Sequence, residues 1–294
     1  MNDTKVNLFI VGAMKAGTTS FVELLSQHQD IFVPPVKEPH FFVDAMPQEL
    51  YEPNKFFSLE NYLEHEFPNP LHITKVETIV QYQRVYSQHQ GETYQLDGST
   101  AYLHAIESAQ KIYEYNPEAK IIVLLRDPLE RSFSHYKMDL GKGRTKASFD
   151  SIMQEEIDRY HSDQLSWYGH LGMSFYREPI ARYQKLFKRV LLLQLDDLIN
   201  YQDTVLRDIS SFLEIESFSD SVVSHKNSAR KPLFPRVVFF LKKAGLHHYF
   251  SKVFSSTFKQ WLTRRISSED KFELKLSEET KLALEQIFKK ESQI

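Results

Sequence analysis

A glycine-containing loop near the N-terminus has the composition of an anion-binding site. It places Gly12, Lys15, Gly17, Thr18 and Thr19 within eight residues. Glycine lets backbone N–H groups approach an anion, and the start of a following helix adds its dipole and two hydroxyl donors. This is not a Walker A loop, which needs Lys directly after the second Gly. The loop predicts a phosphate cradle. The alternative is a strand–helix turn that includes a Lys by chance.

A second cluster of anion-binding residue types follows the most aliphatic segment of the chain. It contains Arg126, Asp127, Arg131, Ser134 and Tyr136. An Arg at the carboxyl end of a central strand stands where open α/β sheets bind ligands, and its planar fork fits phosphate oxygens. We therefore expect a second phosphate contact here. The alternative is a solvated Arg126 beside a surface helix, with Arg131 paired to Glu130 or Asp127.

Alternating strand and helix patterns surround these two clusters. Buried-type apolar runs predict strands at residues 7–11, 94–97, 120–125 and 189–195. Apolar residues at helical spacing predict helices at residues 18–27, 129–140, 177–187, 201–213 and 277–290. Residues 34–39 are proline-rich and are expected to form a loop, and residues 49–90 a mixture of helix and loop. The order predicts an α/β fold of one domain, with a central parallel sheet flanked by helices.

The composition narrows the chemistry that is available. The 294 residues are 41% hydrophobic and 26% charged, carry a net charge of −3 and include no Cys. Disulfides, thiolate catalysis and Cys-ligated metals are therefore excluded. The N-terminus lacks the pattern of a signal peptide, and no window reaches the ~20 apolar residues of a membrane span. A cytoplasmic protein is expected.

The charge is unevenly distributed. Residues 221–268 contain ten Lys or Arg and no acidic residue, so the rest of the chain carries −13. Such a segment implies an anionic partner, which could be a nucleotide, a polyanion or a membrane surface. Its aromatic residues also suit an interfacial helix, so peripheral membrane contact through residues 232–265 is one possibility. No nucleic-acid partner is expected.

The two phosphate clusters resemble the sulfotransferase family. Residues 12–20 (GAMKAGTTS) are similar to its 5′-phosphosulfate loop, and residues 126–136 (RDPLERSFSHY) to its 3′-phosphate motif. Residues 37–42 (KEPHFF) resemble a Glu-x-His-Phe-Phe segment of heparan-sulfate-type and related bacterial carbohydrate sulfotransferases. Residues 97–102 and 227–231 stand where that group has a Glu-Lys-Thr-Pro-like stretch and a cofactor loop. The resemblance covers residues 5–231, which leaves residues 232–294 as a basic, aromatic extension.

The resemblance implies a P-loop-like fold and 3′-phosphoadenosine 5′-phosphosulfate (PAPS) as donor, with no metal. The residues that it assigns to the 5′-phosphosulfate are Lys15, Ala16, Gly17, Thr18, Thr19 and Ser20. Those that it assigns to the 3′-phosphate are Arg126 and Ser134, with Arg230 and Lys231 closing over the nucleotide.

Sulfuryl transfer also requires groups that handle charge and protons. Lys15 can stabilise the negative charge that grows on the leaving phosphate. Glu38 is the candidate base for the acceptor hydroxyl, with His40 as its orienter or substitute. The alternatives remain open: Glu38 could be an exposed loop carboxylate paired with Lys37, and His40 a half-buried ring beside phenylalanines.

One position departs from the family pattern. The heparan-sulfate group has a Lys in its Glu-Lys-Thr-Pro stretch, and this chain has Gly98 there. If that Lys assists the reaction, another group must replace it here. His104 is a candidate for that role, and a structural histidine is the alternative.

Three functional alternatives remain. A P-loop kinase would need Lys after the second Gly and an acidic strand end for Mg²⁺, and this chain has Thr18 and Arg126 at those positions. A non-catalytic module could bind a polyanion or membrane through the basic segment. Within the sulfotransferase interpretation, the interleaved aromatic and basic residues favour a carbohydrate acceptor, with a small-molecule or lipid alcohol as alternative.

Overall fold

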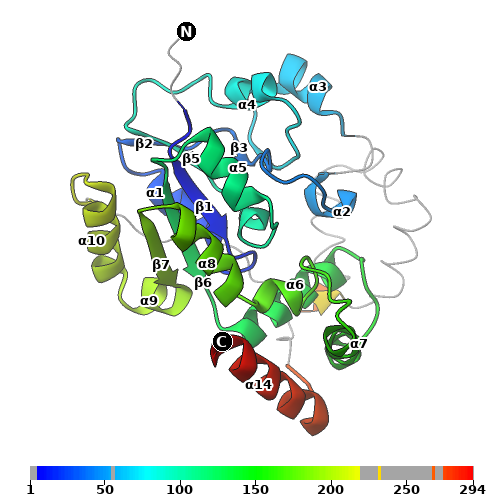
Figure 1. Cartoon of the computed structure of the whole chain (residues 1–294). Helices are drawn as coiled ribbons and strands as arrows, with labels where there is room; N and C mark the ends of the chain where they lie inside the picture. The colour runs from blue at the N-terminus through cyan, green and yellow to red at the C-terminus, as the bar shows by residue number, and fades with distance from the viewer. Residues whose placement is uncertain (1–4, 54–56, 219–230, 233–266, 269–273, 294) are drawn as a thin grey trace. The chain divides into compact units, whose positions relative to one another are not determined.

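The computed structural model describes residues 5–53, 57–218, 231–232, 267–268 and 274–293 (Figure 1). The chain divides into two compact units. The first contains residues up to Asp127 together with those from Phe175 to the end of the range 57–218. The second contains Pro128–Ser174 and the described residues after 230.

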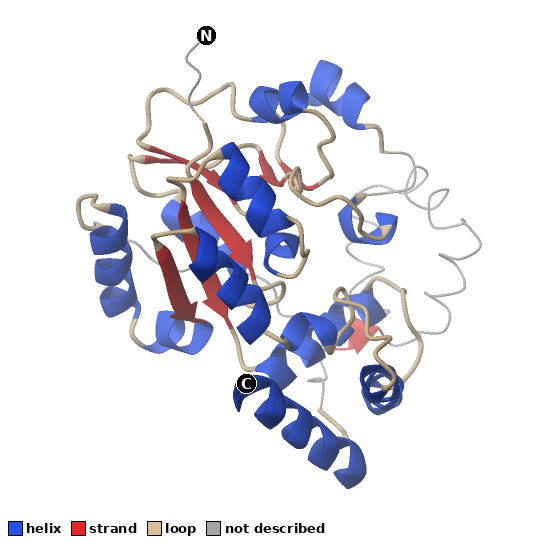
Figure 2. Ribbon diagram, in the orientation of Figure 1, coloured by secondary structure: helices blue, strands red, loops and turns tan. Residues whose placement is uncertain are grey.

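The first unit is built on a five-stranded parallel sheet (Figure 2). In spatial order its strands are β2 (Ile31–Phe32), β5 (Tyr94–Asp97), β1 (Leu8–Gly12), β6 (Lys120–Leu125) and β7 (Val190–Gln194). Every residue of β1, β5 and β6 is buried. Burial on both faces explains why β1 and β6 are almost wholly apolar, whereas β5 also buries Gln95 and Asp97. Because β1 and β6 are parallel neighbours, their carboxyl ends lie at the same edge of the sheet.

Helices cover this sheet. They are α1 (Thr18–Leu25), α5 (Ser108–Tyr115), α8 (Arg177–Leu186), α9 (Leu195–Asn200) and α10 (Gln202–Leu213). In Figure 1, α5 and α8 lie side by side in front of the strands, and α1 is partly hidden behind them. Each connection between parallel strands thus passes through a helix, as a parallel sheet requires.

Residues 36–85 form a smaller layer that carries part of the candidate site. The strand β3 (Val36–Glu38) pairs in parallel with β4 (Leu71–Ile73). The helices α2 (Gln48–Tyr51), α3 (Leu59–Asn61) and α4 (Ile79–Val85) and a π-helical turn (Tyr62–Glu66) belong to the same stretch. A 3₁₀ turn, η2 (Thr100–Leu103), follows β5.

The second unit is mainly helical. It contains α6 (Pro128–Gly141), α7 (Phe149–His161), a 3₁₀ turn (Gly172–Ser174), the short pair β8 (Lys231–Pro232) and β9 (Ser267–Ser268), and α14 (Glu278–Gln293). The last helix is held to α7 by polar contacts. The Tyr160 hydroxyl donates to Glu291 Oε1 at 2.8 Å, and the Ser277 N–H donates to Asp150 Oδ1 at 2.8 Å.

The predicted fold class is confirmed: a central parallel sheet is flanked by helices. The strands at 94–97 and 120–125 match the predicted bounds, and the final helix spans 278–293. The expected loop at 34–39 is partly wrong, because residues 36–38 form a strand. Its partner at 71–73 comes over thirty residues later, a pairing that local patterns do not reveal.

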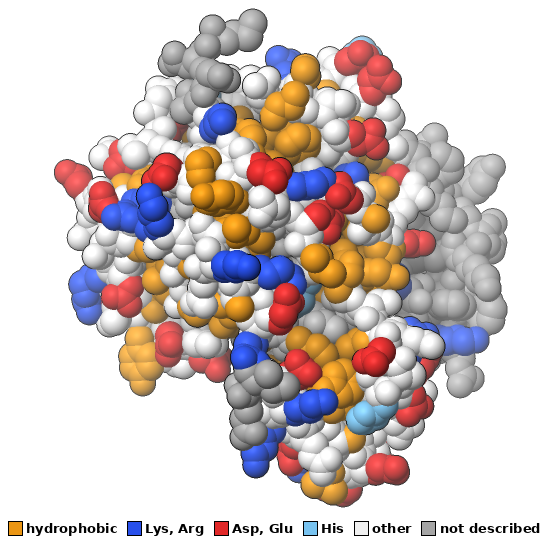
Figure 3. Space-filling model, viewed as in Figure 1, with side chains coloured by type: hydrophobic (Ala, Val, Ile, Leu, Met, Phe, Trp, Pro, Cys, Tyr) orange, Lys and Arg blue, Asp and Glu red, His pale blue; other side chains and the backbone are white. Residues whose placement is uncertain are grey.

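Most of the basic segment at 221–268 lies outside the described residues. The division into a core over 5–231 and an extension over 232–294 stays a prediction. None of the helices that the structure describes has the length and apolarity needed to cross a bilayer. On the face that Figure 3 shows, the described acidic and basic side chains are interspersed.

Candidate functional site

The glycine loop lies between β1 and α1, as its sequence predicts. Gly17 has a φ of 85°, and Lys15 also adopts the left-handed conformation, with a φ of 71°. The Ala13 N–H donates to the Leu124 carbonyl at 2.7 Å, which ties the loop to β6. The backbone conformation at Gly17 favours glycine, and a Cβ added there would lie 2.8 Å from Leu195 Cδ1, so the end of that side chain would have to shift. Left-handed residues within such a loop can turn backbone N–H groups toward one anion.

The predicted phosphate ligands of the first unit meet at one edge of the sheet. Thr18 is buried at the start of α1, and Lys15, Thr19 and Ser20 are half-buried there. Arg126 directly follows β6, and its Nη1 lies 3.5 Å from the Lys15 carbonyl oxygen. The structure therefore brings Arg126 and the glycine loop together, at the carboxyl ends of two neighbouring strands.

Glu38 is buried and makes contacts with the side chains of four residues, of which His40 is described below. Its Oε2 accepts a hydrogen bond from the Thr100 hydroxyl at 2.8 Å. Its Oε1 accepts one from Lys37 Nζ at 2.6 Å and lies 3.8 Å from Nε2 of His72. The expected pairing with Lys37 is present, but the alternative of an exposed carboxylate is wrong, because only 5% of Glu38 is exposed.

The environment of Glu38 keeps its carboxyl group ionised. Burial alone would raise the pKa, but the positive charge of Lys37, with smaller effects of the neighbouring His40 and His72 imidazoles, outweighs it and lowers the pKa to about 2. The two oxygens differ in access. Oε2 faces the buried Thr100, whereas Oε1 faces His72, whose side chain is 60% exposed. Oε1 therefore lies on the side of the carboxylate that is nearer to an exposed side chain.

His40 lies beside Glu38 and is completely buried, not half-buried. Its backbone N–H donates to Ser99 Oγ at 3.0 Å, and its Nδ1 lies 3.2 Å from the Thr74 carbonyl oxygen. A carbonyl can only accept, so Nδ1 carries the proton and the lone pair of Nε2 faces Glu38 Oε2, 3.5 Å away. Burial lowers the pKa of His40, which favours this neutral form.

Close packing connects Glu38 with the glycine loop. A Cβ added at Gly12 would lie 2.8 Å from Leu103 Cβ and 3.2 Å from the Thr100 carbonyl oxygen. The absence of a side chain at Gly12 thus lets η2 approach the end of β1. Since Thr100 in turn donates to Glu38, one short chain of contacts joins the candidate base to the start of the candidate phosphate loop.

A buried carboxylate that the sequence did not single out supports this arrangement. Asp97 Oδ2 accepts hydrogen bonds from the hydroxyls of Tyr82 at 2.8 Å and Tyr102 at 2.9 Å, and Oδ1 accepts one from the Ser99 N–H at 3.0 Å. Burial raises the pKa of Asp97 to about 6 against the effect of these donors. The contacts fix the turn that presents Thr100 to Glu38.

The structure gives a physical reason for Gly98. A Cβ at this position would lie 3.1 Å from Val22 Cγ2 and 3.4 Å from the Lys37 carbonyl oxygen, so a lysine side chain would be crowded. His104 is buried, and its Nε2 lies 3.0 Å from the Phe175 carbonyl oxygen, which suits a structural role. Lys37 supplies a cation at Glu38 instead.

The remaining predicted ligands belong to the second unit or lie outside the described residues. Ser134 is half-buried on α6. Arg131 is completely buried, so the surface pairing with Glu130 or Asp127 does not describe it. Its Nε donates to Ser174 Oγ at 2.7 Å, and its Nη2 donates to the His170 carbonyl. Arg230 is outside the described residues, and the backbone of Lys231 forms part of β8.

Several solved structures share this fold. A sulfotransferase from Alicyclobacillus acidocaldarius is 28% identical, with a TM-score of 0.60 over 76% of this chain and 87% of its own. A mouse sulfotransferase, SULT7A1, complexed with PAP is 12% identical, with a TM-score of 0.50 over 100% of this chain and 86% of its own. At that identity the second likeness shows the fold alone. The predicted P-loop-like α/β fold is thereby confirmed.

The curated relatives are carbohydrate sulfotransferases. Rat carbohydrate sulfotransferase 15 is 22% identical over an alignment of 180 residues that covers 55% of this chain and 32% of the relative. Mouse heparan sulfate glucosamine 3-O-sulfotransferase 5 is 25% identical over 183 residues, 60% of this chain and 44% of the relative. The chain spans less than half the length of these relatives. The profile described as the sulfotransferase family matches residues 7–220, which include both phosphate motifs, and the chain belongs to that family.

Proposed function

We propose that the chain is an enzyme that transfers a sulfuryl group from PAPS to a hydroxyl or amine of an acceptor. The observation that carries this proposal is the placement of an ionised, buried Glu38 beside the start of the glycine loop. Thr100 links the two, because its carbonyl oxygen packs against Gly12 and its hydroxyl donates to Glu38. Family membership and the two phosphate motifs support the same reaction.

The proposed reaction balances with the groups at hand. The acceptor oxygen attacks the sulfur of the donor as its proton passes to Glu38 Oε1, and the bond from sulfur to the 5′-phosphate oxygen breaks. Negative charge then grows on that phosphate, where the Lys15 ammonium can stabilise it. His40 lies on the other side of the carboxylate, with Nε2 3.5 Å from Oε2, and is the candidate residue that orients it.

In the first unit, donor binding falls to the glycine loop and Arg126. The backbone around Gly17 and the hydroxyls of Thr18, Thr19 and Ser20 would bind the 5′-phosphosulfate, and Arg126 the 3′-phosphate. Ser134 remains a candidate from the sequence motif. The reaction proposed here needs no metal, because the lysine and the backbone amides supply the electrostatic stabilisation. Arg230 and Lys231 remain candidates for closing over the nucleotide.

A carbohydrate is the acceptor class that we favour. Both curated relatives described above are named for carbohydrate or heparan sulfate sulfotransferase activity. Lys37 and the exposed His72 lie at the open side of Glu38, where they suit an acceptor that itself carries negative charge. The basic segment at 221–268 is consistent with such an acceptor. A small-molecule or lipid alcohol is the alternative that the assay must test.

A transfer assay with ³⁵S-labelled PAPS tests this function directly. Heparan and chondroitin precursors, neutral oligosaccharides and simple alcohols are offered in parallel, and products are identified by mass spectrometry. We expect label in an acidic glycan. Label only in alcohols would contradict the acceptor class. A protein that binds PAPS but labels none of the panel would contradict the proposed transfer to these acceptors.

Arg126→Ala should weaken binding of 3′-phosphoadenosine 5′-phosphate far more than binding of the analogue without the 3′-phosphate. Charged hydrogen bonds of this type contribute roughly 1.5–3 kcal/mol, or about 10- to 150-fold in Kd. Isothermal titration of both nucleotides measures the difference. Arg207→Ala, at an exposed arginine of α10, is the matched control. Equal losses for both nucleotides would show that Arg126 serves the fold and not the 3′-phosphate.

Lys37→Met should shift the acidic limb of the pH–rate profile to higher pH. Lys37 is the largest of the influences that lower the pKa of Glu38 to about 2, whereas burial, which raises it, remains in the variant. Glu38 then becomes protonated, and inactive as a base, at a higher pH than in the wild type. The profile of kcat/KM between pH 4 and 8 measures this shift. Lys188→Met, at an exposed lysine, serves as control. If Lys37→Met and the wild type give identical profiles, Lys37 does not control the ionisation of Glu38 during the reaction.

A further inference from the structure

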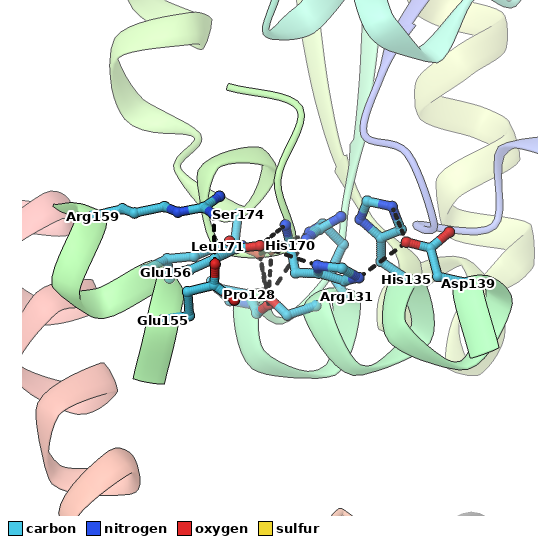
Figure 4. A network of polar contacts seen from close by, with 11 residues as sticks. Pro128, Arg131, His135, Asp139, Glu155, Glu156, Arg159, His170, Leu171 and Ser174 are labelled. Atoms are coloured by element: carbon cyan, nitrogen blue, oxygen red, sulfur yellow. Dashed lines mark hydrogen bonds and ion pairs between the residues drawn. The ribbon is translucent and has the colours of Figure 1, made fainter. Parts of the chain in front are cut away.

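The second unit contains a cluster of two histidines and an aspartate that the proposed reaction does not use (Figure 4). His135 and Asp139 are four residues apart on α6, which places them on the same face of the helix. His170 approaches them from the segment that precedes the 3₁₀ turn Gly172–Ser174. His135 and Asp139 are buried, and His170 is half-buried.

The nitrogen atoms of both histidines converge on one carboxylate oxygen. Nε2 of His170 lies 3.1 Å from Asp139 Oδ2, and Nε2 of His135 lies 3.5 Å from the same oxygen. The three residues each offer one ligand atom, and these three atoms all lie within 4.8 Å of one another. Two ligands bound at 2.0–2.1 Å to a tetrahedral Zn²⁺ are about 3.3 Å apart. The two measured separations therefore match the spacing of ligands around such an ion.

A second carboxylate orients the imidazole of His170. Glu156 Oε1 lies 3.1 Å from Nδ1 of His170, and the same carboxylate accepts from the N–H groups of His170 and Leu171 at 2.9 and 2.5 Å. Nδ1 must then carry a proton, which leaves Nε2 as the atom that faces Asp139. A ligating histidine whose other nitrogen donates to a carboxylate is the usual arrangement in metal sites. The Nε2 of His170 is buried, and its contact with Asp139 lacks hydrogen-bond geometry.

The charges around the cluster allow two states. Asp139 Oδ1 also accepts a hydrogen bond from Arg144 Nη1 at 3.0 Å, so the positive charge of Arg144 is balanced within the cluster. Without a metal, a doubly protonated His170 could bridge the two carboxylates. That state does not use His135, whose Nε2 nonetheless points at the same Oδ2. The convergence of three potential ligands favours a metal ion over a simple bridge.

We propose that Nε2 of His135, Oδ2 of Asp139 and Nε2 of His170 bind one divalent transition-metal ion, Zn²⁺ by ligand preference, with water in the fourth position. Two imidazoles and one carboxylate are common zinc ligands. The side chains of Asp139 and His170 are 12% and 13% exposed, so the ion has a route of entry. The ion would join α6 to the segment around His170 and stabilise the second unit, with no part in the transfer step.

The test uses the full chain, stripped of metal with a chelator and then titrated with Co²⁺ and Zn²⁺. Tetrahedral Co²⁺ absorbs visible light strongly, so we expect a visible band that saturates at one equivalent and is displaced by Zn²⁺. The melting temperature should rise with the Zn²⁺ concentration, since a ligand that binds the native state stabilises it by mass action. His170→Ala and His135→Ala should each weaken Zn²⁺ binding by about 100-fold or more. Glu156→Gln should weaken it about 10- to 100-fold.

His65→Ala, at an exposed histidine of the first unit, should leave binding unchanged and so controls for surface histidines. If an alanine variant fails to fold, the wild-type titration and Asp139→Asn still decide the question. A folded wild-type protein that gives no visible Co²⁺ band and no Zn²⁺-dependent stabilisation would overturn the proposal. Binding that survives in both histidine variants would overturn it as well.

Discussion

Lys15→Ala should lower kcat by on the order of 10²-fold or more and change the affinity for PAPS much less. The reason is that the ammonium group matters most as charge develops on the leaving phosphate, and less while the donor is merely bound. Single-turnover rates give the chemical step, and equilibrium titration with the product nucleotide gives the affinity. An unchanged turnover number would refute the role assigned to Lys15.

The backbone at this position calls for a second variant. Lys15 has a φ of 71°, a conformation that Asn tolerates better than Ala. Lys15→Asn therefore removes the ammonium with less backbone strain than Lys15→Ala. If both variants lose turnover equally, the loss of charge explains the effect. If Lys15→Asn keeps wild-type turnover while Lys15→Ala does not, the lysine acts only through the shape of the loop.

Glu38→Gln should lower kcat by roughly 10²–10⁴-fold, the usual contribution of a general base. The amide oxygen of Gln can still accept the hydrogen bond from Thr100, so the fold around the site should survive. Because the pKa of Glu38 is about 2, the wild-type carboxyl group is ionised at pH 7, and the loss should be fully visible there. Initial rates at saturating donor and acceptor, measured at pH 7, show the effect.

Glu118→Gln is the matched control, because its carboxylate is exposed and pairs only at the surface with Lys188. It should behave as the wild type. If Glu38→Gln retains wild-type turnover at pH 7, the base is another group. His40→Asn would then be the next variant, since His40 Nε2 is the nearest titratable nitrogen on the buried side of Glu38.

The parts of the fold that sequence patterns predicted are those with strong local signals. The run KIIVLL at 120–125 is buried on both faces in the middle of the sheet, and such strands must be almost wholly apolar. By contrast, β3 and β4 are each three residues long, and β3 lies within the proline-rich stretch at 34–39 and pairs with a strand at 71–73. Neither has enough alternation to be recognised without its partner, so this pair could not have been predicted.

The candidate site, too, could be predicted from the sequence only where its signals are local. The two phosphate motifs are local patterns, and Arg126 and the glycine loop meet as expected. The contact of Thr100 with Glu38, and the fixing of its turn by Asp97 between two tyrosines, depends on residues brought together only by folding. Arg131 is another example. The sequence left open that it pairs with Glu130 or Asp127 on a surface helix, whereas its guanidinium is buried against Ser174 and the His170 carbonyl.

The order of strands in the sheet has a consequence for how the chain folds. The central strand β1 pairs with β5 and β6, where Leu8 lies opposite Leu96 and Lys120. Both partners are made long after β1 has left the ribosome, and closing such long loops slows folding. Until β5 is available, β1 has two unpaired edges, and one edge stays unpaired until β6 follows. An apolar strand in that state invites aggregation. The glycine loop is tied to Leu124, so it can take its final shape only after that late pairing.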